Sequence, residues 1–330
     1  YQKIAFDAFA KQIRLLSDIK TKSKTVPTVE CTDKQNGMLW DDFHDITIRA
    51  VLEAPNGKKK PGYGLKVSDR DIVAGVKIAA RNNSYHPVKE YLSDVGETWD
   101  GEDRIATFAD RYLGTGQNAY TSEAFRMMMI ASVARIFSPG CKFDYAAILE
   151  GGQGIGKSTM IKCLYGEEFF GEMDADLGDR RETSEQLAGK WALEMSELSA
   201  LNKADHGHAK QFMRRQDDDV RGAYERNVTR HPRQCVVWGS TNESLYLRDP
   251  TGNRSYWVFK CSGDPIDLKG ILQEKDQLWA QAVVEHNLMR AKYPRGDLPL
   301  TLTGEALRIA EELQEGARQT EMWEDWTEDL

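Results

Sequence analysis

The spacing of apolar residues is helical before about residue 143 and changes to short extended runs after it. In the first part, the pattern predicts helices at about 1–16, 41–53, 68–82, 103–113 and 121–137. Ser68 precedes one of these segments and Asp71 follows three positions later, as expected at a helix N-cap. The methionine-rich helix at 121–137 is predicted to lie in the core, because thioether side chains fill gaps between packed apolar groups.

Four short apolar runs after residue 143 are predicted as strands, at about 144–150, 190–195, 233–240 and 254–261. A helix is predicted after the first of them, and another at about 205–215. The chain then continues as helices, one from about 271 to Pro294 and one that begins near Thr303. Strands that alternate with helices are typical of a parallel sheet, so the predicted fold class is α/β.

These elements divide the chain into four predicted parts. They are an N-terminal helical or winged-helix-like accessory module (1–88), a helical bundle that links to the core (89–140), an α/β core (141–262) and a C-terminal helical region (263–330). The helices at 41–53 and 68–82 are joined by a turn-rich basic loop. This arrangement fits a winged-helix-like module and a helical adaptor without a ligand about equally well.

Composition narrows the class of protein. At 330 residues the chain is long enough for about two domains, and its 40% hydrophobic content supplies a core. No apolar run reaches the roughly 18 residues that a membrane-spanning helix needs. The five cysteines are odd in number and include no C-x-x-C pair, which argues against a disulfide framework and a zinc site. We therefore expect a cytoplasmic protein that does not bind membranes.

The clearest chemistry lies in EGGQGIGKSTM at 150–160, between a predicted strand and a predicted helix. It contains the phosphate-binding loop (P-loop) pattern G-x-x-x-x-G-K-[ST]. Glycines let the backbone curl around phosphates with its N–H groups pointing inward, and the following helix adds its positive dipole end. The pattern predicts ATP and Mg²⁺ as cofactors, with Lys157 neutralising phosphate charge and Ser158 reaching the metal ion. The residues expected to bind nucleotide are Gly151, Gly152, Gln153, Gly154, Ile155, Gly156, Lys157, Ser158 and Thr159.

Hydrolysis also needs polar groups at the ends of neighbouring strands. Glu194 and Glu197 lie at the end of a predicted apolar strand. One would hold the Mg²⁺-bound water and the other would polarise the attacking water, unless both only face solvent. Asn242 ends the next strand, where an amide can orient water, although a polar turn explains it equally well. Arg248 and Arg254 are candidates for an arginine finger, since a planar cation suits a phosphoryl group in transfer. A finger that acts on a neighbouring subunit would make activity depend on assembly.

Taken together, these motifs resemble a known family. EGGQGIGKST, KWALEMSEL, RQCVVWGSTN and DPTGNRSYW, with HPVKEYL, WDGEDRI and SPGCKFDYAAILE upstream, are similar to the virulence-associated E family of phage and mobile-element proteins over about residues 40–290. The resemblance implies a P-loop NTPase of the AAA+ class, similar to hexameric superfamily 3 helicases and encoded by a prophage or similar element. It also implies that Glu194 and Glu197 form the Walker B pair, that Asn242 is sensor 1 and that Arg254 is the finger.

Two positions depart from the family pattern. Met195 and Ser196 separate the two glutamates, which leaves the division of roles within the pair open. Ser255 follows Arg254 where members of the family more often carry a second arginine.

Residues 210–233 carry seven basic and four acidic side chains, in a chain whose net charge is −8. This local excess, with Phe212 and Tyr224 interleaved, suits contacts to the phosphates of a nucleic-acid strand. In the helicases that the chain resembles, this position holds a hairpin that projects into a central pore. A face of salt bridges between subunits is the alternative. The residues predicted to bind nucleic acid are Lys210, Arg214, Arg215, Arg221, Arg226, Arg230 and Arg233.

Three functions fit these features. The first is an ATP-hydrolysing motor that forms a homo-oligomeric ring, expected to be a hexamer, and acts as a helicase or translocase on single-stranded or forked DNA during replication of a phage or mobile element. A primase or host replication factors are candidate partners. The second is a nucleotide-gated DNA-binding or scaffold protein without unwinding activity. The third, a small-molecule kinase, fits the strand-end asparagine and the late arginines less well.

Overall fold

The computed structural model describes residues 3–19, 29–33, 37–54, 63–173, 180–196, 203–220, 229–243 and 253–317. The chain divides into two compact units, Tyr1–Glu90 and Tyr91–Leu330, with the boundary inside helix α3 (Pro87–Gly96). Among the described helices, none combines the length and the apolar character that crossing a bilayer would require.

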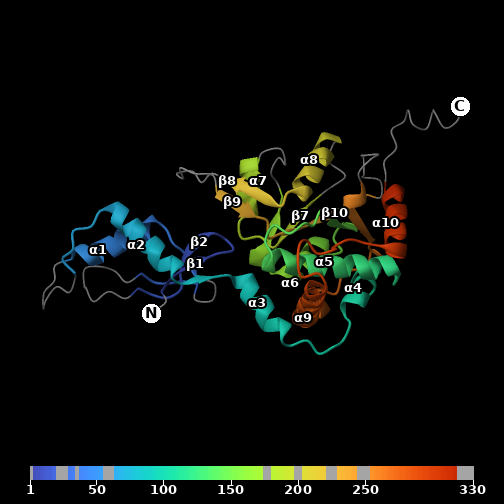
Figure 1. Ribbon diagram of the computed structural model, residues 1–330, viewed down its shortest axis with the longest axis horizontal. Helices are drawn as coiled ribbons and strands as arrows, with labels where there is room; N and C mark the ends of the chain where they lie inside the picture. The colour runs from blue at the N-terminus through green and yellow to red at the C-terminus, as the bar shows by residue number, and fades with distance from the viewer. Residues whose placement is uncertain are drawn as a thin grey trace. The chain divides into compact units, whose positions relative to one another are not determined.

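The first unit combines a small sheet with two helices (Figure 1). Its strands are β1 (Ile4–Asp7), β2 (Gln12–Leu15), β3 (Met38–Leu39) and β4 (Ser84–Tyr85), which pair in the order β3-β2-β1-β4. Its helices are α1 (Asp42–Glu53) and α2 (Asp69–Arg81). Both were predicted, and the N-cap of α2 is confirmed because the Ser68 hydroxyl accepts a hydrogen bond from the backbone N–H of Asp71 at 3.2 Å.

The helix predicted at 1–16 is wrong, because β1 and β2 form an antiparallel hairpin there. Asp7 explains the turn: its Oδ1 accepts from the backbone N–H groups of Phe9 and Ala10, both at 2.9 Å. Lys11 completes the turn in the left-handed region, with φ of 58°. An aspartate that binds the backbone two and three residues ahead favours a turn over a helix. The N-terminal module is therefore mixed α and β rather than helical.

The second unit is built on a five-stranded sheet in which every strand is parallel to its neighbours. The strands are β5 (Ala146–Glu150), β6 (Phe170–Glu172), β7 (Ala192–Met195), β10 (Val236–Thr241) and β11 (Tyr256–Lys260), in the order β11-β5-β10-β7-β6. The predicted α/β class and the four predicted strands are confirmed. The sequence pattern missed β6, a three-residue strand at the edge of the sheet that follows a short 3-10 turn, Glu167–Phe169.

Helices cover both faces of this sheet. They are α4 (Ile105–Leu113), α5 (Ala119–Phe137), α6 (Lys157–Tyr165), α7 (Arg180–Leu187), α8 (Lys203–Arg214), α9 (Leu268–Lys292) and α10 (Gly304–Gly316). Figure 1 shows α7 and α8 over one face and α5, α6 and α9 over the other. On the first face, Phe212 and Met213 of α8 pack against the strand residues Ile148 and Val237. A separate antiparallel hairpin, β8 (Asp217–Val220) with β9 (Thr229–Pro232), lies between α8 and β10 in the chain.

On the other face, buried aromatic side chains surround Tyr165 at the end of α6. The rings of Trp191, Trp238 and Trp279 stand edge-to-face to Tyr165, with centroids 5.0, 6.2 and 5.2 Å away. The Tyr165 hydroxyl also forms hydrogen bonds with Ser132 Oγ at 2.8 Å and with Trp238 Nε1 at 3.2 Å. Edge-to-face rings and a satisfied hydroxyl both stabilise a core. This cluster therefore anchors the helix that begins at Lys157.

Replacing Tyr165 by phenylalanine keeps the ring and removes the hydroxyl. We expect Tyr165→Phe to lower the free energy of unfolding by about 1–3 kcal/mol, because the buried Trp238 N–H loses its partner. Urea unfolding followed by tryptophan fluorescence measures the change. Tyr293→Phe, at an exposed tyrosine that follows α9, is the matched control and should change stability by less than about 0.5 kcal/mol. Equal effects of the two substitutions would contradict this account of the core.

Candidate functional site

The P-loop lies at the carboxyl edge of the sheet, between β5 and α6. β5 pairs with β10 on one side and with β11 on the other, although the chain passes through β6 and β7 before it reaches either. β5 is therefore the point where the strand order reverses, and open α/β sheets bind ligands beyond the carboxyl ends of strands at such a point. The order β5-β10-β7 also brings the ends of these three strands next to one another.

The backbone of the loop has the features of an anion site. Gly154 and Gly156 adopt the left-handed region, with φ of 82° and 98°, which strains other residues. Among the described backbone groups, none accepts a hydrogen bond from the N–H groups of residues 152–156. The first N–H groups of α6, which begins at Lys157, follow directly. Unpaired N–H groups at a glycine loop and a helix start are the donors that bind phosphate.

Lys157 joins the loop to the end of β10. Its ammonium donates to the carbonyl oxygens of Gly151 at 2.5 Å and Gly152 at 2.8 Å, and to Asn242 Oδ1 at 2.8 Å. Burial lowers the pKa of Lys157 below its ordinary value, because desolvation disfavours the charged form. A bound anion would favour that charge again. The structure thus brings together a lysine and an asparagine that the sequence singled out separately.

Ser158 joins the loop to the end of β7. Its hydroxyl donates to Glu194 Oε1 at 2.8 Å. Glu194 is fully buried, and its other oxygen, Oε2, has no hydrogen-bond partner among the described residues. An orphaned buried carboxylate oxygen is costly unless a cation or donor satisfies it. Because carboxylate and hydroxyl oxygens are the ligands that Mg²⁺ prefers, these two side chains fit a magnesium ion.

Arg254 does not meet these groups. It lies in a short 3-10 turn, Asn253–Ser255, directly before β11, so it stands at the amino edge of the sheet. The P-loop stands at the carboxyl edge, and a strand of this length separates the two edges by about 15 Å. Two further predicted residues, Glu197 and Arg248, lie outside the described residues.

The predicted nucleic-acid segment divides into different environments. Arg233 is 3% exposed, and its guanidinium forms a two-point ion pair with Asp218, Nε to Oδ2 at 3.0 Å and NH2 to Oδ1 at 2.8 Å. It also lies over the Phe212 ring, 4.2 Å from the centroid. A buried and neutralised arginine cannot contact a nucleic acid, so the prediction for Arg233 is corrected.

The structure describes three of the remaining basic side chains of the segment, Arg214, Arg215 and Arg230. Arg230 is exposed on β9 and pairs with Asp217 across the hairpin. Arg214 is exposed at the end of α8, and Arg215 beside it is half-buried. Lys210 lies on α8, but the structure does not describe its side chain. Arg221 and Arg226 lie outside the described residues.

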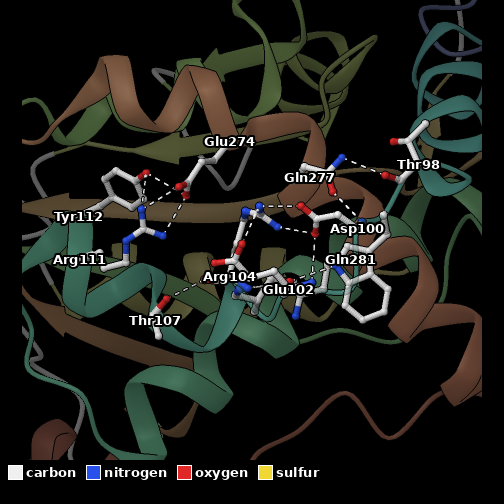
Figure 2. Close-up of polar contacts among 12 residues, drawn as sticks. Thr98, Asp100, Glu102, Arg104, Thr107, Arg111, Tyr112, Glu274, Gln277 and Gln281 are labelled. Carbon is white, nitrogen blue, oxygen red and sulfur yellow. Dashed lines mark hydrogen bonds and ion pairs between the residues drawn. The ribbon is translucent and has the colours of Figure 1, made fainter.

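The site also depends on residues that the sequence did not single out. The backbone N–H of Ile266, just before α9, donates to the P-loop carbonyl of Ile155 at 2.9 Å. α9 is in turn fastened to residues 98–112, as Figure 2 shows. There Arg111 and Tyr112 both bind the Glu274 carboxylate, with Arg111 NH2 at 2.7 Å from Oε1 and the tyrosine hydroxyl at 3.0 Å from Oε2.

The WDGEDRI motif supplies the rest of this network. The Arg104 guanidinium donates to both Asp100 oxygens at 2.7 Å, and this contact lowers the pKa of Asp100 to about 2. Gln281 of α9 accepts from the backbone N–H of Arg104 at 3.0 Å and donates to Asp103 Oδ1 at 2.6 Å. The motif, which in the sequence only contributes to the family resemblance, thus connects the start of α4 to α9 (Figure 2). The many acidic and basic residues in this short motif were the feature of the sequence that could have indicated a network of ion pairs.

Among solved structures, two of those similar to the chain are forms of the NrS-1 C-terminal region. The apo structure gives a TM-score of 0.46 at 13% identity, covering 94% of this chain and 71% of that chain. The A form apo structure gives a TM-score of 0.42 at 16% identity, covering 66% of this chain and about half, 51%, of that chain. TM-scores below 0.5 at this identity do not show a shared function. Curated proteins give no significant match.

The sequence profile of the virulence-associated protein E-like domain matches residues 92–319. The match contains the P-loop, all five strands of the parallel sheet and the polar network on α9. It covers more than half of the chain, and it confirms the resemblance drawn from the motifs. The chain therefore belongs to the virulence-associated protein E-like domain family.

Proposed function

We propose that this protein is an ATP-dependent motor ATPase that assembles as a ring and acts as a DNA helicase or translocase in the replication of a phage or other mobile element. The observation that carries the proposal is the convergence of three strand ends on the P-loop, where Lys157 contacts Asn242 and Ser158 contacts Glu194. Family membership supports the link to mobile elements.

In the proposed reaction, the loop N–H groups and Lys157 bind the β- and γ-phosphates of ATP. Water attacks the γ-phosphorus, the bond to the bridging oxygen of the β-phosphate breaks, and ADP and phosphate are the products. Ser158 and Glu194 would hold Mg²⁺, which neutralises phosphate charge when it is bound. We assign Asn242 to orienting the water, and Glu197 to the second carboxylate of the pair.

The position of Arg254 supports assembly. A guanidinium at the amino edge of the sheet cannot reach a γ-phosphate held at the carboxyl edge of the same chain, about 15 Å away. It can act as a finger only on the nucleotide of a neighbouring copy, with Arg248 as the alternative finger. Contacts that join opposite edges of successive copies are head-to-tail, and such contacts generate rings when the rotation closes. We propose a hexamer.

The hairpin β8-β9 supports the proposed DNA contact. It lies in the chain between β7 and β10, where the sequence predicts a nucleic-acid segment, and Arg230 is exposed on it. We propose that Arg230, together with Arg221 and Arg226 in the segment that joins the two strands, contacts the phosphates of single-stranded DNA.

Lys157→Ala should weaken binding of ATP by about tenfold to a hundredfold, because the loop loses the ammonium that pairs with phosphate oxygens. Isothermal titration calorimetry with ATP and Mg²⁺ measures the affinity. Lys292→Ala, at an exposed lysine at the end of α9, is the control and should bind like the wild type. An unchanged affinity in Lys157→Ala would remove the P-loop from the proposal.

Glu194→Gln should leave ATP binding nearly intact and slow hydrolysis by about a hundredfold or more. The amide keeps an oxygen for the Ser158 hydroxyl but removes the negative charge that the buried site directs at the metal ion. Single-turnover hydrolysis separates the two effects. Glu311→Gln, at an exposed glutamate of α10, controls for the loss of one charge. Full activity of Glu194→Gln would assign the chemistry to another carboxylate.

Single-stranded DNA should accelerate hydrolysis if the protein is a motor, whereas a nucleotide-gated scaffold would hydrolyse ATP at the same rate with or without DNA. Arg230→Ala should weaken DNA binding and reduce the slope of log affinity against log salt concentration by about one. Fluorescence anisotropy over a salt series measures both quantities. Arg308→Ala removes another exposed, ion-paired arginine on α10 and should leave DNA binding unchanged. Identical salt slopes for wild type and Arg230→Ala would exclude the hairpin contact.

A further inference from the structure

A cavity of about 350 Å³ lies at the amino edge of the parallel sheet, on the side of the strands away from the P-loop. Its walls come from the residues that precede β5 and β11, from the end of α8 and from residues 298–301. Two arginines that the sequence assigned to different tasks, Arg214 and Arg254, both line it. Neither belongs to the site formed by Lys157 and Glu194.

The charges around the cavity are unbalanced. Arg214 and Arg254 are exposed, and within the described residues neither forms an ion pair or a hydrogen bond. The third cation, Lys142, has a carboxylate beside it, since its Nζ lies 4.0 Å from Asp144 Oδ2. Two arginines that have no ion-pair partner among the described residues thus line one cavity, whose carboxylate, Asp144, lies beside Lys142. Two like charges in one cavity repel each other, and a bound anion turns this repulsion into attraction.

Another part of the cavity wall is held in place by ring stacking and a hydrogen bond. The Tyr145 ring stacks on Trp257 with centroids 4.4 Å apart, and Trp257 is buried in the sheet. The Tyr145 hydroxyl forms a hydrogen bond with Thr301 Oγ1 at 2.8 Å. Because these side chains are already ordered, little conformational entropy is lost when a ligand binds in the cavity.

Size and charge indicate the class of ligand. A volume of about 350 Å³ is at the lower end of small-ligand sites and accommodates a phosphoryl group with its neighbour, not a stretch of nucleic acid. Planar guanidinium groups match the tetrahedral oxygens of phosphate by two-point hydrogen bonds. We propose that Arg214 and Arg254 together bind one phosphoryl group of a polyphosphate in this cavity.

The molecule that supplies this phosphoryl group follows from the proposed function, and the assignment of that molecule rests on the proposed function. The P-loop of the same chain stands at the opposite edge of the sheet, so the phosphate reaching the cavity belongs to the nucleotide of a neighbouring copy. Arg214 then acts on the same phosphoryl group as Arg254. It is a catalytic residue rather than a DNA contact.

The binding step is tested on the full chain with inorganic tripolyphosphate as the probe. In a Lys157→Ala background, which weakens the P-loop site, we expect calorimetry to detect tripolyphosphate binding. Adding Arg214→Ala or Arg254→Ala should weaken it by about tenfold or more, and to a similar degree. Adding Arg308→Ala should not change it. Binding that neither arginine affects, or no binding in the Lys157→Ala protein, would overturn the proposal. The proposal would also be overturned if Arg214→Ala weakened binding of an oligothymidylate but not of tripolyphosphate, because Arg214 would then be a DNA contact.

The source of the phosphate is tested by mixing variants. Arg214→Ala and Lys157→Ala proteins should each hydrolyse ATP poorly, and their mixture should regain activity, because the intact P-loop of one meets the intact arginines of the other. If binding depends on the arginines but mixing restores nothing, the cavity takes free polyphosphate and the neighbouring nucleotide is excluded as its source. If the wild type hydrolyses no ATP, the proposed function fails, while the calorimetric result still decides the cavity.

Discussion

Parallel pairing of β5 with both β10 and β11 is the constraint on which the second unit depends. The register sets Glu150 opposite Thr241 and Lys260 at one edge, and Ala146 opposite Val237 and Tyr256 at the other. Because all strands run in the same direction, each segment that follows a strand falls at the carboxyl edge and each segment that precedes one falls at the amino edge. The P-loop and the candidate arginine cavity are therefore separated by the length of the strands. The parallel direction of the strands is sufficient to place them at opposite edges of the sheet.

The P-loop is supported from two directions. The aromatic cluster around Tyr165 holds the end of α6 against the sheet, and the hydrogen bond from Ile266 to Ile155 ties the loop to the segment before α9. α9 is in turn bound to α4 by the network around Arg104 and Glu274 (Figure 2). Exposed ion pairs of this kind contribute little free energy each. Two-point arginine contacts do restrict geometry, so this network fixes where the helix lies.

Three arginines show why the number of charges in a segment does not predict which of its side chains bind a ligand. Arg233, Arg230 and Arg214 lie within 20 positions of one another and look equivalent in the sequence. In the structure, Arg233 is buried against Asp218, Arg230 is exposed in an ion pair, and Arg214 lines a cavity. A local excess of positive charge therefore does not identify a binding surface until the partners of each side chain are known.

The sequence by itself determined the local features: most of the helices from their apolar spacing, four of the five strands of the parallel sheet, the cap at Ser68 and the P-loop pattern. Each depends on residues close together in the chain, whose preferences can be read in order. The hairpin at the N-terminus was not predicted, because its apolar residues have helical spacing. The hydrogen bonds from Asp7 to the backbone stabilise a turn there instead of a helix. Only the tertiary structure decided that Lys157 meets Asn242, 85 positions away, and that Arg214 and Arg254 share a cavity. The physical reason is that strand order and register bring such residues together, and these are set by packing across the whole sheet rather than by any one segment.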